Sequence, residues 1–399
     1  MGNRRLDQAP SATHGKCARR SDQASSATHG KCARRSDQAS SANCGRLATG
    51  HRSCKAAARP TFAREAWSVA PLARVRLRRS APLVLATFLL TTPGAAQPSP
   101  PGPLPPGAEA RSLLGQPLVP PALAPAIREA YEQRLAEARR AHERTPDNTD
   151  SIIWLGRRTA YLGRYREAIA IFGDGIRKHP TDARMYRHRG HRWITVRELD
   201  RAIADLARAD SLTRGRPDEV EPDGIPNARG IPTSTLQSNI RYHLGLAHYL
   251  LGHFDAAAAI YGRDVAAARE TANADMLVAS SHWLYMALRR SGREREAAAV
   301  LQPIRSDLPV IENGSYHRLL LMYKGELAAD SVLPRQPGGE PDFGGVEGVT
   351  VGYGVANWHF YHGRTEQAMA LFRKILESPQ WAAFGFIAAE SEVARKREQ

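Results

Sequence analysis

The feature that most constrains this chain is a spacing of 34 residues that recurs in its central part. Gly156 and Gly190 are 34 residues apart, and Ala168 and Ala202 keep the same interval. Within each unit the apolar residues recur with the period of an α-helix, first in one helix and then, after a short turn, in a second. This period predicts a stacked array of helical hairpins, in which each hairpin buries its apolar face against its neighbours.

Five segments share the pattern, and we place the starts of the repeats at Thr149, Ala183, Ser238, Val278 and Val349. The eighth position is glycine in the first three repeats, the twentieth is alanine in all five, and a proline precedes the first two repeats; these signature residues are Gly156, Gly190, Gly245, Ala168, Ala202, Ala257, Ala297, Ala368, Pro146 and Pro180. The twenty-fourth position is always large and apolar: Phe172, Leu206, Tyr261, Leu301 and Phe372. Small residues let the two helices of a hairpin cross closely, and we expect the large residue to fill the gap to the next hairpin.

This pattern resembles that of the tetratricopeptide repeat (TPR) family. The resemblance covers residues 121–398 and implies an all-α fold, a right-handed superhelical solenoid of helix-turn-helix hairpins. It also implies a concave groove lined by the first helix of each repeat. Carried over position by position, the candidate groove residues are Arg157, Arg184, Arg187, His191, Tyr242, Tyr249, His282, Arg289, Tyr353, Asn357 and Phe360.

These groove candidates are mainly basic and aromatic. Arginine pairs with carboxylates through two parallel hydrogen bonds, and aromatic side chains offer rigid contact area. The resemblance therefore implies a protein or peptide partner, one that carries acidic groups or a free C-terminus. The family's carboxylate clamp requires lysine and asparagine at positions 5 and 9, whereas this chain has Ile153 and Arg157 there in the first repeat. The alternative for any single candidate is a solvated charged surface.

The array departs from its period in two places. Gly190 and Gly245 are 55 residues apart, so 21 extra residues form a loop between the second and third repeats. Further on, a helix from Ser315 has only a short partner and is followed by an irregular segment. We also expect a single helix that ends at Pro146 to cap the front of the array, and a terminal helix in the last residues of the chain to close the back.

No catalytic, metal or cofactor site is predicted. His188 with His191, and His359 with His362, are pairs that share one side of a helix, but neither has the third ligand that a catalytic zinc requires. We therefore expect a binding scaffold rather than an enzyme. The alternative from another class is an envelope hydrolase that uses glutamate and histidine from the irregular region 333–364, where loops could carry activity.

The N-terminal quarter differs from the rest in charge and in cysteine content. Residues 1–97 carry 17 Lys and Arg against 4 Asp and Glu, which leaves 39 against 36 for residues 98–399. All four cysteines precede residue 60: Cys17, Cys32, Cys44 and Cys54. A nearly neutral body without cysteine suits an exported protein and gives no reason to expect nucleic-acid binding.

Four segments follow from this composition. Residues 1–73 repeat a fifteen-residue stretch, and we interpret them as a low-complexity tract that is either disordered or lies before the true start of translation. Residues 74–97 have the basic, apolar and small-residue parts of a signal peptide, which predicts a periplasmic or secreted protein without a stable membrane anchor. Residues 98–120 are proline-rich and predict an extended linker before the repeat domain at 121–398. If the basic N-terminus is retained instead, the alternative is a cytoplasmic protein associated with nucleic acid.

Overall fold

The computed structural model describes residues 102–398, so the tract 1–73 and the signal peptide predicted at 74–97 lie outside the described residues. The elements of the described part are β1 (Ala110–Arg111), β2 (Pro117–Leu118), α1 (Pro125–Arg144), α2 (Thr149–Tyr161), α3 (Tyr165–Lys178), α4 (Ala183–Thr195), α5 (Leu199–Thr213), α6 (Leu236–Leu250), α7 (Phe254–Glu270), α8 (Ala274–Arg290), α9 (Glu294–Leu301), α10 (Gly314–Lys324), α11 (Ala329–Val332), α12 (Val346–Tyr361), α13 (Thr365–Ile375) and α14 (Phe384–Glu398).

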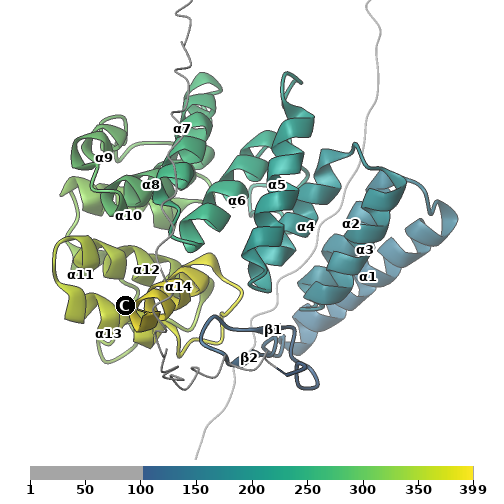
Figure 1. Cartoon of the computed structure of the whole chain (residues 1–399), viewed down its shortest axis with the longest axis horizontal. Helices are drawn as coiled ribbons and strands as arrows, with labels where there is room; N and C mark the ends of the chain where they lie inside the picture. Colours follow the sequence, from purple (N-terminus) through teal and green to yellow (C-terminus); the bar gives the residue numbers. More distant parts are fainter. Residues whose placement is uncertain (1–101, 399) are drawn as a thin grey trace, which may run out of the picture. The chain divides into compact units, whose positions relative to one another are not determined.

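The helices form an all-α array of TPR-like hairpins, as the sequence predicts (Figure 1). The hairpins are α2 with α3, α4 with α5, α6 with α7, α8 with α9, and α12 with α13. The first helices also pack against one another, α2 with α4, α4 with α6, α6 with α8, and α8 with α12. We call the surface that these five helices share the first-helix face.

Local sequence explains where the first helices begin. Asn148, Asp182, Thr235 and Asn273 precede α2, α4, α6 and α8, and the side chain of each accepts a hydrogen bond from a backbone N–H of the first turn. Such caps satisfy donors that a helix start leaves without partners. The second helices begin without a side-chain cap, directly after the tight turn that closes the first helix.

Close packing inside each hairpin follows the predicted alternation of small and large residues. All five alanines at position 20 are fully buried. A Cβ atom added to Gly156 would lie 2.5 Å from the ring of Phe172, and one added to Gly190 would lie 2.6 Å from Leu206. The large residue at position 24 therefore covers the glycine of its own hairpin. Phe172 also stacks on His188 of the next repeat, at 5.5 Å between ring centres, so the expected contact between hairpins is present as well.

The turn after each first helix requires a left-handed residue at position 15. Gly163, Gly252, Gly292 and Gly363 take it with φ between 73° and 81°. The second repeat instead has Arg197, with φ of 69°. A residue with a Cβ atom in this region costs about 1–2 kcal/mol, so Arg197 is held there by other contacts.

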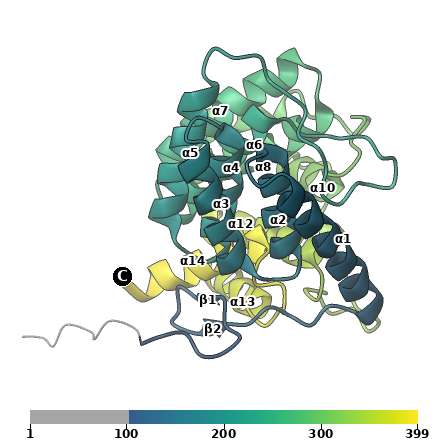
Figure 2. The ribbon, with the colours of Figure 1, turned by 90° about the vertical axis from the view of Figure 1, so that its right-hand side faces the viewer.

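Residues 102–120, the described part of the linker predicted at 98–120, do not form an extended spacer. Ala110 pairs with Leu118 and Arg111 with Pro117 in the small antiparallel hairpin β1–β2. This hairpin lies beside α14 (Figure 2), and the backbone N–H of Leu113 donates to Glu390 of α14 at 2.7 Å. The prediction of a spacer fails because long-range contacts order a segment that has little local preference for sheet.

The C-terminal third is irregular in the way that the sequence indicates. Helix α10 has only the four-residue α11 after it, and the segment 333–345 that follows contains no helix. Helix α10 packs against α8, α9 and α12. The last helix, α14, packs against α12, α13 and α6, so it lies on the first-helix face of the array and not simply beyond its last hairpin.

Candidate functional site

The structure divides the eleven groove candidates into three groups. Arg157, Arg187, His191 and Tyr242 lie on α2, α4 and α6 around two adjoining cavities. A second group is buried within the array and consists of Tyr249, His282, Tyr353 and Asn357. The third group lies outside both regions and consists of Arg184, Arg289 and Phe360.

The buried group has hydrogen-bond partners within the chain. The hydroxyls of Tyr249 and Tyr353 are 2.8 Å apart, and the amide of Asn357 donates to Tyr249 at 3.0 Å. Arg290 donates to Glu392 of α14 at 2.7 Å, in the same network. Tyr249, Tyr353 and Asn357 are enclosed in the interior of the protein. Their role as contacts for a partner stays a prediction.

His282 is enclosed in the same way. Its ring stacks on Tyr316 and Tyr323 of α10, with ring centres 4.7 Å and 5.8 Å away. Burial lowers the pKa of His282 to about 3. The side chain is therefore neutral at neutral pH and serves as a packing residue.

Helix α14 is fixed to the first-helix face by a buried ion pair. Nε of Arg197 donates to Oε2 of Glu390 at 2.9 Å, and Nη2 donates to the carbonyl oxygen of Trp381 at 2.8 Å. Burial lowers the pKa of Arg197, and the neighbouring Glu390 carboxylate opposes this effect. The left-handed conformation of Arg197 thus places a cation where α14 supplies an anion.

The first cavity has a volume of about 140 Å3 and is predominantly cationic. We call it the basic cavity, and its charged or titratable lining residues are Arg157, Tyr161, Arg187, His188, His191, Arg192 and Glu221. Nε of Arg187 lies 3.0 Å from the Glu221 carboxylate. Nη2 of Arg192 lies 2.7–2.8 Å from both ring nitrogens of His191.

The inserted loop 214–235 forms one wall of the basic cavity. Arg157 donates to the carbonyl of Pro222 at 2.9 Å, and Arg158 donates to that of Gly224 at 2.7 Å. A Cβ atom on Gly224 would lie 1.6 Å from the hydroxyl of Tyr161 and 2.8 Å from Nη2 of Arg157, so glycine lets the loop approach α2 without displacing these side chains. The loop brings the carboxylate of Glu221 onto the first-helix face.

The histidines of this region are held neutral. Burial, together with Arg187, Arg192 and other nearby cations, lowers the pKa of His188 and His191 well below the usual value. Burial also lowers the pKa of Arg192 to about 10, so its guanidinium stays charged at neutral pH. The positive charge in the cavity therefore comes from its arginines.

A second cavity of about 350 Å3 adjoins the first and shares Arg187 and His191 with it. We call it the aromatic groove, because Tyr242, Tyr316 and Phe384 line it together with the polar side chain of Asn239. The hydroxyls of Tyr242 and Tyr316 are 2.8 Å apart. The ring of Phe384 lies 6.1 Å from that of Tyr242, so the first residue of α14 forms one end of this groove.

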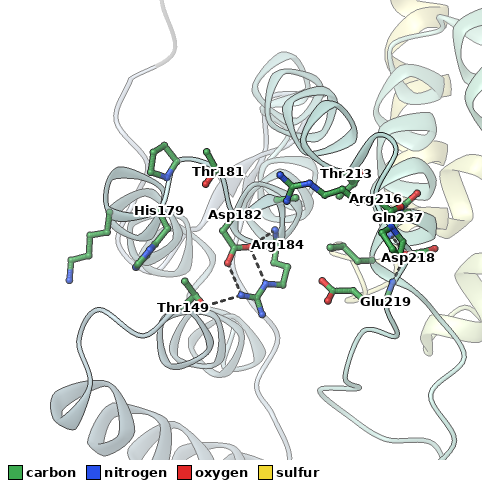
Figure 3. A pocket seen from close by; sticks show the side chains of 15 residues that line it. Thr149, His179, Thr181, Asp182, Arg184, Thr213, Arg216, Asp218, Glu219 and Gln237 are labelled. Carbon is green, nitrogen blue, oxygen red and sulfur yellow. Dashed lines mark hydrogen bonds and ion pairs between the residues drawn. The ribbon is translucent and has the colours of Figure 1, made fainter.

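Arg184 lies in a third, outer cavity of about 780 Å3 at the N-terminal ends of α2, α4 and α6 (Figure 3). Its guanidinium donates to Asp150 at 2.6 Å, to Thr149 at 2.9 Å and to Asp182 at 2.6 Å. The hydrogen bond to Asp182 raises the pKa of Arg184. Its charge is therefore already paired, and Arg184 is not among the residues that line the basic cavity.

Arg289 and Phe360 lie near the turns that follow α8 and α12. The guanidinium of Arg289 is 4.6 Å from the ring centre of Tyr361, and Arg289 donates to Glu294 at 3.1 Å. The ring of Phe360 lies 4.5 Å from the guanidinium of Arg290. Neither residue lines the two adjoining cavities.

Among residues 102–398, no group of three His, Cys, Asp or Glu side chains is placed to hold a metal ion. The region 333–364 contains an isolated bridge, Arg335 with Pro341, and the whole of α12. His359 there accepts a hydrogen bond from Nε of Arg364 at 2.7 Å. No helix in the described part is long and apolar enough to cross a bilayer.

Sequence reasoning missed several side chains of the two cavities. Arg192 and His243 occupy repeat positions that the resemblance does not assign to the groove, and Glu221 and Phe384 come from the inserted loop and the terminal helix. One sequence signal pointed to the loop: its acidic stretch 218–223 comes directly after the repeat whose first helix, α4, is strongly basic. Opposite charges of this kind favour contact, although they do not fix which residues meet.

No family model matches the chain, and no curated protein matches it. Several solved structures are similar to it over part of its length. The TPR protein YrrB, described as having an unusual peptide-binding site, is 13% identical over 60% of this chain and 91% of its own, with a TM-score of 0.34. A putative kinesin light chain of Podosopora anserina with TPR-like repeats is 14% identical over 64% of this chain and 98% of its own, with a TM-score of 0.35. MamA AMB-1 is 17% identical over 45% of this chain and 90% of its own, with a TM-score of 0.31.

Proposed function

We propose that this protein is a scaffold that binds another protein or a peptide on the part of its first-helix face formed by α2, α4 and α6. The observation that carries the proposal is the adjoining pair of cavities, one cationic and one aromatic, that share Arg187 and His191. Aromatic and arginine side chains dominate the energetics of protein interfaces. Farther along this face, α14 packs against α6 and α12, and α10 packs against α8 and α12.

The inserted loop supports the same location. Its aliphatic side chains Val220, Ile225 and Ile231 are exposed, Val220 to 62%. Exposed apolar side chains beside a groove are typical of interaction surfaces. A partner that carries acidic groups would place them near the basic cavity, and apolar groups would contact the aromatic groove and the loop.

A peptide-display selection with the immobilised full chain tests this proposal. Selected peptides should bind the wild type and lose at least about ten-fold in affinity to a Phe384→Ala variant and to an Arg157→Glu variant. Arg208→Glu on the exposed side of α5 is the matched charge control and should bind as the wild type does. Selected peptides that bind all four proteins equally would refute the assignment to this face.

Export is a second part of the proposal. It is supported by the signal-peptide pattern at residues 74–97 and by the absence of cysteine after Cys54 in the sequence. The test is the N-terminal sequence and intact mass of the protein recovered from each cell fraction. A chain that begins near Gln97 in the envelope fraction agrees with export, and a chain that begins at Met1 in the cytoplasm contradicts it.

A further inference from the structure

The charges around the basic cavity do not balance. Arg157, Arg187 and Arg192 line it, and Glu221 is the only carboxylate among its lining residues. Beyond the lining lie Arg158, which donates to the carbonyl of Gly224, and Asp223, whose pKa is raised by burial although Arg157 opposes this shift. This outer pair adds one charge of each sign. The side chains that line the cavity therefore carry an excess of about two positive charges.

Such an excess is costly in a partly closed site, because a buried cation is stabilised mainly by a nearby anion with good hydrogen bonds. Arg187 is only 8% exposed, and its Nε has no acceptor along its N–H direction although the Glu221 carboxylate is 3.0 Å away. Arg192 has a ring of His191 at hydrogen-bonding distance and no carboxylate partner among the described residues. The cavity therefore contains donors that no acceptor among residues 102–398 uses.

The size and charge of the cavity define the anion that would use these donors. A volume of 140 Å3 equals roughly four to five water molecules at about 30 Å3 each. A phosphate monoester carries a charge of about −1.5 to −2 at neutral pH, which matches the excess, whereas a carboxylate carries only one. Guanidinium groups also bind phosphate oxygens through two parallel hydrogen bonds.

We infer that the basic cavity is a binding site for a phosphoryl group, held by Arg157, Arg187 and Arg192 between α2, α4 and the inserted loop. This inference deepens the proposed function and rests on it, because the cavity belongs to the same face. Glu221 contacts Arg187 in the absence of the anion and competes with it. The phosphoryl group is either free phosphate or part of a bound peptide.

The test is calorimetric titration of inorganic phosphate into the full chain, with sodium chloride of equal ionic strength as the reference. Phosphate should give saturable binding that chloride does not. Arg157→Gln and Arg192→Gln should each weaken binding at least about ten-fold, which corresponds to about 1.4 kcal/mol. Arg208→Gln is the matched control and should leave the affinity unchanged, and Glu221→Gln should raise it. Circular dichroism establishes that each variant is folded.

Arg157 is partly exposed, so its replacement keeps the test valid if the Arg192 variant does not fold. Equal heats for phosphate and chloride, or an unchanged affinity in Arg157→Gln, would overturn the inference. A phosphoserine peptide and its serine counterpart then distinguish the two sources. Tighter binding of the phosphopeptide than of inorganic phosphate assigns the group to a peptide, and equal affinities assign it to the free ion.

The two proposals fail separately. Display-selected peptides that bind through Phe384 while phosphate does not bind would remove only the phosphoryl site. Saturable phosphate binding without any selected peptide would remove the peptide scaffold and leave the cavity as a site for a free anion.

Discussion

Replacement of Arg197 by glycine tests the link between the second repeat and α14. Four other repeats have glycine at this position, and Arg197 adopts the same left-handed conformation with φ of 69°. By local reasoning alone, glycine should stabilise the turn by about 1–2 kcal/mol. We expect the opposite result, because the arginine side chain holds α14 in place.

The magnitude follows from the buried ion pair. The side chains of Arg197 and Glu390 are 3% and 1% exposed. Removal of one partner from a buried pair typically costs about 3–5 kcal/mol, since the other charge is left without compensation. With the backbone gain subtracted, Arg197→Gly should lower stability by roughly 1–4 kcal/mol. For a domain of this size, about 2–4 °C in Tm per kcal/mol gives a decrease of roughly 2–16 °C.

Hydrogen exchange is the most direct assay, because repeat arrays do not always unfold in a single step. Arg197→Gly should reduce amide protection in α14 and in residues 110–118, which are bonded to the same glutamate, and leave α2 and α3 unchanged. The double variant Arg197→Gly with Glu390→Gln removes the uncompensated charge and should regain part of the lost stability. A single variant as stable as the wild type, with full protection in α14, would refute the reasoning.

Three other predictions concern packing, pH and the loop after α9. Gly190→Ala should destabilise the protein by about 1–3 kcal/mol, because the new Cβ atom would lie 2.6 Å from Leu206. Gly173→Ala is the control: its Cβ atom would lie 3.5 Å from the nearest side-chain atom, so it should be neutral or stabilising in thermal denaturation. The pKa of His282 is lowered to about 3, so the stability that its neutral form contributes is complete above about pH 6.5 and is lost as the pH falls toward 3. In this window His282→Phe should flatten the dependence of the unfolding free energy on pH by up to about 1.4 kcal/mol per pH unit. An unchanged slope would contradict this prediction. The carboxylate of Asp275 accepts hydrogen bonds from the backbone N–H groups of residues 311–313 at 2.8–2.9 Å. Asp275→Asn should therefore lower stability by about 1–3 kcal/mol and accelerate proteolysis in that segment. Equal cleavage rates in the variant and the wild type would exclude this role.

The hairpins could be predicted from sequence because their packing depends on residues at fixed spacing. Alanine at position 20 and glycine at position 8 leave room for the neighbouring helix, and the large residue at position 24 occupies that room. This information lies within one 34-residue unit and is repeated. The second repeat shows its limit, since Arg197 replaces the expected glycine and the reason lies 193 residues away in Glu390.

The position of α14 could not be predicted for the same physical reason. Its sequence pattern indicates a terminal helix, but not which surface of the array receives it. By composition alone, Glu390 and Glu392 would be expected on an exposed side of α14. In the structure both side chains are buried and pair with Arg197 and Arg290. The loop 214–235 presents the same difficulty, because Glu221 reaches Arg187 through the path of 21 inserted residues that no repeat describes.

The closure of the array and the shape of the candidate site depend on each other. Phe384 is the first residue of α14 and also lines the aromatic groove, so the ion pair that fixes α14 also fixes one end of that groove. The basic cavity has no lining residue from α14. If α14 is released by Arg197→Gly, binding in the aromatic groove should therefore weaken while phosphate binding is retained. Equal losses at both cavities would mean that the second repeat itself is distorted, and no loss at either would place the binding surface away from Phe384.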